Sequence, residues 1–295
     1  MEMTARVAIA AAIKVTIVLL MVSLGLQTTH RDLLRLWRRP RLLVGCLIAA
    51  FVVVPVAAYA VFHMLPLSFA AKVGLWVVAI TPGAPMIYRA ALKRGVGDPG
   101  LAASFQVSVA LLVVIFAPVW LAIISALSGG HYWIPPLVVL KQVSTIQLIP
   151  VLVGLSLRRW LPRIVGQAGK VLTLIGNIGL LVLIAMLLVV LGPRVIAGRE
   201  AWTILAAALI AAAALAGGHL LAGPGPVARV TIANANVQRN IGLALAIATW
   251  NLPEQKAETV VVIATYILVA VVAAAVYTSV YKAFGAQATT AREGA

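Results

Sequence analysis

The chain has 295 residues, of which 63% are hydrophobic and 10% charged, and a mean hydropathy of +1.09. This balance excludes a water-soluble domain, and repeated apolar runs of about 18 or more residues predict an all-α polytopic membrane protein. The formal charge of +16 does not indicate nucleic-acid binding, because the basic residues stand in short patches between apolar runs, as they do in cytoplasmic loops.

The apolar segments predict about nine transmembrane helices. They cover residues 7–27, 42–62, 68–95, 101–124, 136–157, 170–191, 202–222, 231–251 and 257–279. Most Lys and Arg residues then fall in links on one side of the membrane, beginning with the arginine-rich run 29–41. The positive-inside rule therefore predicts a plasma (inner) membrane protein with its N-terminus outside and its C-terminus in the cytoplasm, where residues 285–295 form a tail.

The third segment contains a predicted helix break near 81–85. The run Thr81-Pro82-Gly83-Ala84-Pro85 places two prolines and a glycine within five residues, which interrupts a continuous helix. Backbone groups freed there cannot stay unsatisfied in lipid, so they face protein, water or a ligand. A simple kink is the alternative interpretation of this break taken alone.

The stretch Thr231–Asn251 contains a second, more polar break near 234–240. Its polar side chains are Asn234, Asn236, Gln238, Arg239 and Asn240, and an almost apolar helix follows them. A full positive charge between membrane helices is costly unless it faces protein or water. The stretch is therefore a candidate functional site.

The two breaks occupy corresponding places in two similar segments. Residues 68–124 and 222–279 each contain a break, a helix of about a dozen residues, a second breaker and a final apolar span. The predicted topology runs these segments in opposite directions, and inverted repeats with interrupted helices indicate a secondary-transporter site near the midplane. We predict repeats over 1–124 and 125–284, whose two discontinuous helices cross. The alternative is a channel or another non-carrier membrane protein of the same fold.

Several runs resemble the bile acid:sodium symporter family, whose members are also called BASS or SBF-like transporters. The run ITPGAPMIYRAALKRGVGDPGLAASF is similar to the family's C-P-G-G…S-N…L-A-x-G-D signature, and QRNIGLALAIATWNLPE resembles its Q-N…L-A-x-A…P stretch. The runs MVSLGLQTTHRDLLRLWRRPRLLVGCLIAAFVVVPVAAY and PPLVVLKQVSTIQLIPVLVGLSLRR are similar to two further parts of the family. The resemblance implies ten helices in two inverted five-helix repeats, of which this chain would lack the first helix.

The positions that the resemblance assigns to sodium binding carry other residues here. The family's Ser-Asn pair aligns with Ile87 and Tyr88, its Glu with Ala235 and its Gln with Arg239, while Asn240 keeps the family's Asn. No predicted span contains a carboxylate beyond its first two residues, where Glu258 stands in the last span, although sodium favours oxygen ligands and a negative charge among them. A guanidinium instead offers five donors to an anion. We expect Arg239 to stand where sodium would bind, and transport of a small organic anion to be sodium-independent.

The candidate substrate site combines the two breaks with polar residues of the following span. Its members are Arg239, Asn240, Gln238, Asn236, Asn234, Thr81, Gly83, Tyr88, Gln106 and Ser108. Structural roles are the alternative, with Arg239 paired to carbonyl groups and the amides satisfying the broken backbone. We predict no metal site and no cofactor, with sodium left open as a coupling ion. The expected partners are the anion and the lipid bilayer, without nucleic acid, and the absence of hydrolase and metalloenzyme motifs argues against an enzyme.

Other polar residues within the spans have simpler interpretations. Lys14, Lys72 and Lys141 stand near span ends, where we expect their long side chains to reach the interface. Gln142 and Gln147 make the fifth span polar, and either line a path or form hydrogen bonds between helices.

Overall fold

The computed structural model describes residues 2–83, 97–130, 134–161, 165, 167–179, 181–182, 185, 201–252 and 256–293. Within them the chain forms helices α1 (Glu2–Gln27), α2 (His30–Trp37), α3 (Pro40–Ile48), η1 (Ala49–Val53), α4 (Val54–Met64), α5 (Phe69–Ala79), α7 (Pro99–Leu127), α8 (Pro136–Val143), η2 (Ser144–Leu148), α9 (Ile149–Trp160), α11 (Ala201–Leu221), α12 (Pro226–Val237), α13 (Ile241–Asn251) and α14 (Lys256–Glu293). For this part of the chain the predicted all-α class is confirmed. Helix α14 continues through residues 285–293 of the predicted tail.

Five helical stretches of the described residues are long and apolar enough to cross a membrane. They are Pro40–Met64, Pro99–Leu127, Pro136–Trp160, Ala201–Leu221 and Ala257–Ala283. Three further apolar stretches are shorter, namely the C-terminal part of α1 and the whole of α5 and α13. The predicted span 170–191 lies largely outside the described residues, so the count of nine stays a prediction.

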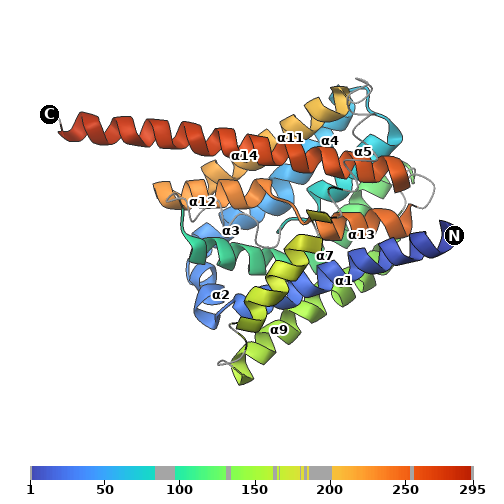
Figure 1. Ribbon diagram of the computed structural model, residues 1–295. Helices are drawn as coiled ribbons and strands as arrows, with labels where there is room; N and C mark the ends of the chain where they lie inside the picture. Colours follow the sequence, from blue (N-terminus) through green and yellow to red (C-terminus); the bar gives the residue numbers. More distant parts are fainter. Residues whose placement is uncertain are drawn as a thin grey trace.

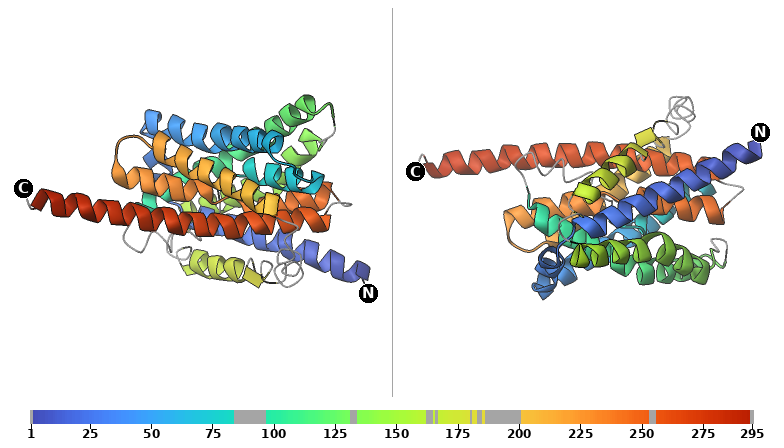
Figure 2. Two further views of the ribbon diagram at one scale, coloured as in Figure 1. Left: turned by 90° about the horizontal axis from the view of Figure 1, so that it is seen from above. Right: turned by 60° about the horizontal axis from the view of Figure 1, so that its bottom comes forward.

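Several helices of the bundle pack lengthwise against one another. Helix α1 runs along α9 and helix α14 along α11 and α5 (Figures 1 and 2). Glycines bring α1 and α9 into backbone contact: a Cβ atom added at Gly154 would lie 2.3 Å from the Val22 carbonyl oxygen, and one added at Gly25 would lie 2.3 Å from that of Val151. Such close approach is how membrane helices associate where the surrounding lipid is as apolar as their side chains.

The arginine-rich link contains a helix that the sequence did not predict. The hydroxyl of Thr29 accepts a hydrogen bond from the Asp32 N–H, and the Asp32 carboxylate accepts one from the Thr29 N–H. This capping box satisfies two backbone donors at the start of α2. Leu36 is buried and its N–H donates to the Ser104 hydroxyl of α7 at 2.9 Å. Helix α2 is thus fixed along α7, although its arginines are exposed.

Two spans contain a π-helical turn followed by a proline. Pro55 is the second residue after η1, and Pro150 the second residue after η2. Proline has no N–H, so the carbonyl group four residues earlier, that of Phe51 in the first case, loses its helical donor. The indole Nε1 of Trp120 donates to this Phe51 oxygen at 2.6 Å. The π-turn thus releases backbone acceptors that side chains of other helices use.

Asp98 ties three helices together at the end of the bundle that carries α2. Its Oδ1 accepts hydrogen bonds from the Gly100 and Leu101 N–H groups at 2.9 and 3.1 Å, which caps α7. Its Oδ2 forms an ion pair with Arg35, and its N–H donates to the Thr231 hydroxyl of α12 at 2.8 Å. The residue therefore acts both as a helix cap and as a charge partner.

The substitution Asp98→Ala is expected to lower the free energy of unfolding by about 0.5–2 kcal/mol, because it removes the N-cap of a long helix. Asp98→Asn keeps a cap acceptor and is expected to stay close to the wild type. The Arg35 side chain is 43% exposed, and an exposed ion pair contributes little. Thermal unfolding of detergent-purified variants measures both effects. Equal losses in the two variants would show that the ion pair matters more than the cap.

Candidate functional site

The two breaks lie against each other in the middle of the bundle. Pro82 and Arg239 form an isolated antiparallel β-bridge, and the Asn240 N–H donates to the Thr81 carbonyl oxygen at 2.8 Å. These two interrupted segments, residues 81–83 and 238–240, are called the crossing below. Backbone groups that leave the helices at one break therefore find partners at the other, as a hydrocarbon surrounding requires.

The first half of the crossing follows from three neighbouring residues. The Thr81 hydroxyl donates back to the Val77 carbonyl oxygen at 2.7 Å and ends α5, and Pro82 supplies no N–H. Gly83 has a φ of +92°, a left-handed conformation that favours glycine. A Cβ atom there would also lie 2.7 Å from Val109 Cγ2 of α7. Both the backbone angle and the space require glycine at this position.

The second half of the crossing is closed by side-chain caps. The Tyr266 hydroxyl of α14 donates to the Val237 carbonyl oxygen at 2.9 Å, at the C-terminus of α12. Asn240 Oδ1 accepts a hydrogen bond from the Leu243 N–H at 3.0 Å and caps the N-terminus of α13. The extended stretch between the two helices is only three residues long. Asn234 and Asn236 consequently lie within helix α12. The break, predicted near 234–240, therefore begins only at Gln238.

Arg239 is the largest fully buried side chain in the described part of the structure, with 1% of its surface exposed. Its Nη1 donates to the Ala50 carbonyl oxygen in η1 at 3.2 Å. Its Nε and Nη2 have no hydrogen-bond partner among the described residues, and the Tyr266 hydroxyl lies beside the guanidinium. A buried charge with unpaired donors is a large cost, and a bound anion would remove it.

The carbonyl groups of η1 also hold a second polar side chain of α12. Asn236 Nδ2 donates to the Ala49 carbonyl oxygen at 3.3 Å and to that of Ala214 in α11 at 2.8 Å. Asn236 Oδ1 is buried without a partner among the described residues. Asn236 and Arg239 are therefore both anchored on consecutive carbonyl oxygens of one π-turn.

A chain of amides connects the crossing to the span that contains η2. Asn240 Nδ2 donates to Gln147 Oε1 at 2.7 Å, and Gln147 Nε2 donates to the Ala110 carbonyl oxygen of α7 at 2.9 Å. Further along, Gln142 and Asn251 exchange hydrogen bonds through their amides at 2.9 and 3.4 Å. Of the two interpretations of this polar span, hydrogen bonding between helices is the one observed for both glutamines.

The remaining sequence candidates divide between the crossing and other contacts. The backbone of Gln106 lies close to the crossing, with its carbonyl oxygen 3.7 Å from the place where a Gly83 Cβ would be, and Gln238 is half-buried within the crossing. Ser108 instead donates to the Ser104 carbonyl oxygen and accepts from Trp37 Nε1 of α2.

Two further candidates are not placed at the crossing. Asn234 donates to the Val230 carbonyl oxygen within α12, and its Oδ1 accepts from the Thr278 hydroxyl of α14 at 3.2 Å. Tyr88, together with its neighbour Ile87, lies outside the described residues.

The electrostatics of the crossing favour an anion. A guanidinium and the N-terminus of α13, with its partial positive charge, meet there. The carboxylates with described side chains, Asp32, Asp98 and Glu258, belong to other parts of the fold. Several oxygen atoms at or beside the crossing, among them those of Thr81 and Val237, already accept hydrogen bonds. These oxygen atoms are therefore already engaged, whereas sodium takes oxygen ligands that are free to bind it.

These features define an integral membrane protein in which the end of α5 and the break between α12 and α13 meet beside a buried arginine. The model of the Sodium Bile acid symporter family matches residues 14–198, more than half of the chain, and the chain belongs to that family. The predicted family is confirmed, and with it a multi-pass membrane protein of a transporter family. The match includes residues 81–83 and ends before α12 and Arg239. No curated protein matches the chain.

Proposed function

We propose that this protein is a secondary transporter that moves a small organic anion across the plasma membrane by alternating access, with the crossing as its substrate site. The observation that carries the proposal is the Arg239 guanidinium, which is 1% exposed and keeps two nitrogen atoms without partners among the described residues. Arg239 neutralises the bound anion, and the N-terminus of α13 adds to the attraction. Membership of the symporter family supports a carrier.

The proposed topology is that of two inverted repeats, 1–124 and 125–284, with the N-terminus outside and the C-terminus in the cytoplasm. The meeting of α5 with the α12–α13 break supports it, because one interrupted helix comes from each repeat. The arginines of α2 supply the cytoplasmic charge that sets the orientation. In this arrangement the anion reaches the crossing from one side at a time, as the helices around it rearrange.

The proposed transport is sodium-independent. In sodium-coupled relatives, the sequence resemblance implies a carboxylate where this chain has Ala235, which is fully buried. Arg239 carries a fixed charge close to this position, and repulsion opposes a second cation there. The guanidinium thus takes the place of the coupling ion within the protein.

A carrier accounts for the crossing better than a channel does. Thr81, Val237 and Asn240 are all fully buried, and the two segments are joined by hydrogen bonds. A selectivity filter instead aligns free carbonyl groups along an open path. Single-channel currents in planar bilayers would contradict the carrier mechanism.

The test is uptake of labelled organic anions into proteoliposomes, with a panel of carboxylates, oxo-acids and sulfonates. We expect the wild type to take up at least one anion equally well with sodium or with choline as the external cation. Uptake that strictly requires sodium would contradict the proposal that Arg239 replaces this ion. Failure of Arg239→Gln to change uptake of any anion would remove the crossing as the substrate site.

A further inference from the structure

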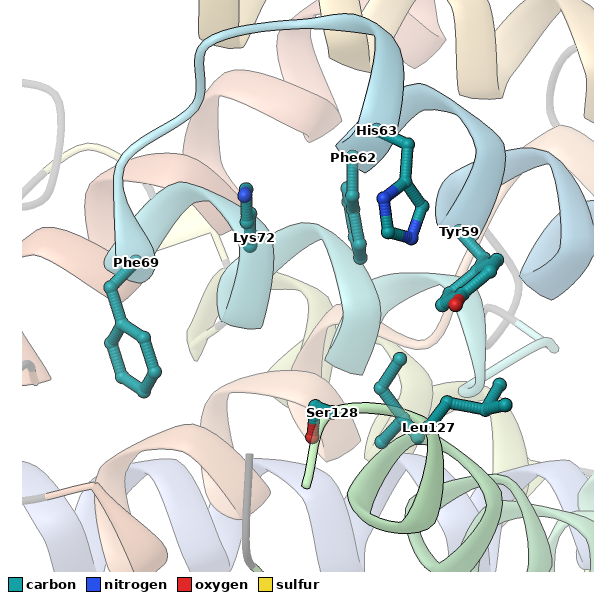
Figure 3. Close-up of a pocket in the computed structure, with 8 residues that line it drawn as sticks. Tyr59, Phe62, His63, Phe69, Lys72, Leu127 and Ser128 are labelled. Carbon is teal, nitrogen blue, oxygen red and sulfur yellow. The ribbon is translucent and has the colours of Figure 1, made fainter. Parts of the chain in front are cut away.

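A cavity of ≈ 300 Å³ opens between the end of α4, the start of α5 and the end of α7. Figure 3 shows Phe69 and Lys72 of α5 on one side of it and Tyr59, Phe62 and His63 of α4 on the other, with the end of α7 below. The volume is at the lower end of the range for small-molecule sites, which is about 300–1,000 Å³. The cavity is large enough for a compact ligand with one or two rings.

The cavity lies at the end of the bundle opposite α2. The continuous span Pro40–Met64 starts beside α2 and ends at the cavity. At 1.5 Å per residue, its 25 residues cover about 37 Å, roughly the thickness of a membrane. If the arginines of α2 are cytoplasmic, as the proposed orientation requires, the cavity opens to the outside.

The lining combines one cation with aromatic walls. Lys72 is half-buried in the first turn of α5, and the residues that line the cavity include no carboxylate. Glu258 stands at the start of α14, which packs on α5, but no ion pair joins it to Lys72 among the described residues. Phe62 and Tyr59 present ring surfaces on which another apolar ring can pack. The sequence predicts only that Lys72 reaches the interface, and it does not predict the aromatic residues that surround it.

The indole N–H of Trp76, which lies behind Phe62, has no hydrogen-bond partner among the described residues. Trp76 lies one helical turn deeper than Lys72 in α5, and its ring centroid is 6.0 Å from that of Phe62. The Trp76 side chain is 3% exposed, and its Nε1 has no hydrogen-bond partner among the described residues. Behind Phe62 there is therefore a buried hydrogen-bond donor that no described residue uses.

The same aromatic residues connect the cavity to the crossing. The Trp76 and Trp120 ring centroids are 5.8 Å apart, and Trp120 Nε1 donates to the Phe51 carbonyl oxygen. Phe51 follows Ala50, whose carbonyl oxygen holds Arg239. The aromatic residues of the cavity wall are thus linked by ring contacts, through Trp76 and Trp120, to the π-turn that anchors Arg239.

We propose that this cavity is a second, outward-facing binding site for a small monoanion that carries an apolar ring. Lys72 Nζ neutralises the anionic group, and Phe62, Tyr59 and Phe69 contact the ring. The site is separate from the crossing, and it rests on the proposed function only in taking its ligand from the transported class. An anion held there is captured at the outer surface before the crossing becomes accessible.

The test is isothermal titration calorimetry with 2-naphthoate on the full chain in phosphatidylcholine nanodiscs. The Arg239→Met background is used so that the crossing does not contribute. We expect binding there, and a loss of about 10- to 100-fold when Lys72→Met is added, since a hydrogen bond to a charged group is removed. Lys141→Met, at an exposed lysine outside the cavity, is the matched control and should bind normally. Leu127→Trp, which puts a larger side chain into the cavity wall while keeping Lys72, should also abolish binding.

Three outcomes would overturn the site. The first is unchanged 2-naphthoate binding in Lys72→Met, and the second is equally tight binding of the neutral 2-naphthamide. The third is loss of 2-naphthoate binding when the nanodiscs contain phosphatidylglycerol, because the cavity would then bind a lipid headgroup. Acetate, which lacks a ring, should bind at least tenfold more weakly. Uptake measurements separate the two proposals. If substitution of Arg239 leaves uptake unchanged while Lys72→Met still weakens 2-naphthoate binding, the crossing is not the substrate site, but the cavity is still a binding site.

Discussion

Arg239→Met is expected to abolish anion uptake while leaving the protein at least as stable as the wild type. The substitution removes the Nε and Nη2 donors, which have no partner among the described residues, and each such buried group costs about 1–3 kcal/mol. It also leaves the Ala50 carbonyl oxygen without its donor, which offsets part of that gain. Loss of two charge-assisted hydrogen bonds to the anion corresponds to about 100-fold or more in uptake.

The measurement pairs uptake into proteoliposomes with thermal unfolding of the same preparations. Arg229→Met is the matched control, because Arg229 lies in the same helix α12 and donates to one backbone oxygen, that of Gly223. It should keep uptake. Arg239→Lys retains the charge but not the planar fork, and we expect intermediate uptake. A purely structural arginine would give the opposite pattern, in which Arg239→Met unfolds at a lower temperature and uptake falls only as far as folded protein is lost.

Gly154→Ala is expected to destabilise the protein by about 3 kcal/mol, at the upper end of the range for overpacking. The added methyl group would lie 2.3 Å from the Val22 carbonyl oxygen, 2.9 Å from the Gly25 Cα and 2.9 Å from the Leu26 nitrogen. All three are backbone atoms, so no side-chain rotation relieves the contact, and α1 and α9 must move apart. Gly154→Leu should prevent recovery of folded protein.

Thermal unfolding in detergent checks this expectation. Gly225→Ala provides the control, because Gly225 has a φ of −71° and a Cβ atom there would meet only Ala228 Cβ at 3.8 Å. We expect it to change stability by less than about 1 kcal/mol. An unfolding temperature of Gly154→Ala equal to that of the wild type would show that the two helices are not held at this distance in the membrane.

The two breaks could be predicted from the sequence because their signals are local. Prolines and a glycine in consecutive positions interrupt a helix wherever it packs, and a positive charge within an apolar stretch marks a site by its cost alone. That Thr81 and Asn240 bond directly to each other required the fold. Sequence reasoning nevertheless paired the two breaks, because they occupy corresponding places in two similar segments.

Several contacts at the site could not be predicted, because they depend on which helices become neighbours. The sequence pattern assigns Asn236 to the polar break, yet it lies in helix α12, where carbonyl oxygens of α11 and η1 accept hydrogen bonds from its Nδ2. The sequence leaves open whether Gln147 lines a path or bonds to another helix, and the structure joins it to Asn240. Lys72 is expected to reach the interface, but which residues surround it there, those at the ends of α4 and α7, depends on the fold.

The π-turn η1 holds Arg239 and Asn236 through main-chain oxygen atoms, those of Ala50 and Ala49. The amino acids at these two positions contribute no side-chain group to the anchor, so substitutions of similar volume would leave it intact. Divergent relatives could therefore keep this anchor while sharing no residue identity in the turn. A comparison of the side chains in the turn would therefore not detect the anchor. A proline at the position of Pro55, which shapes the helix at this point, would be the residue to look for in such relatives.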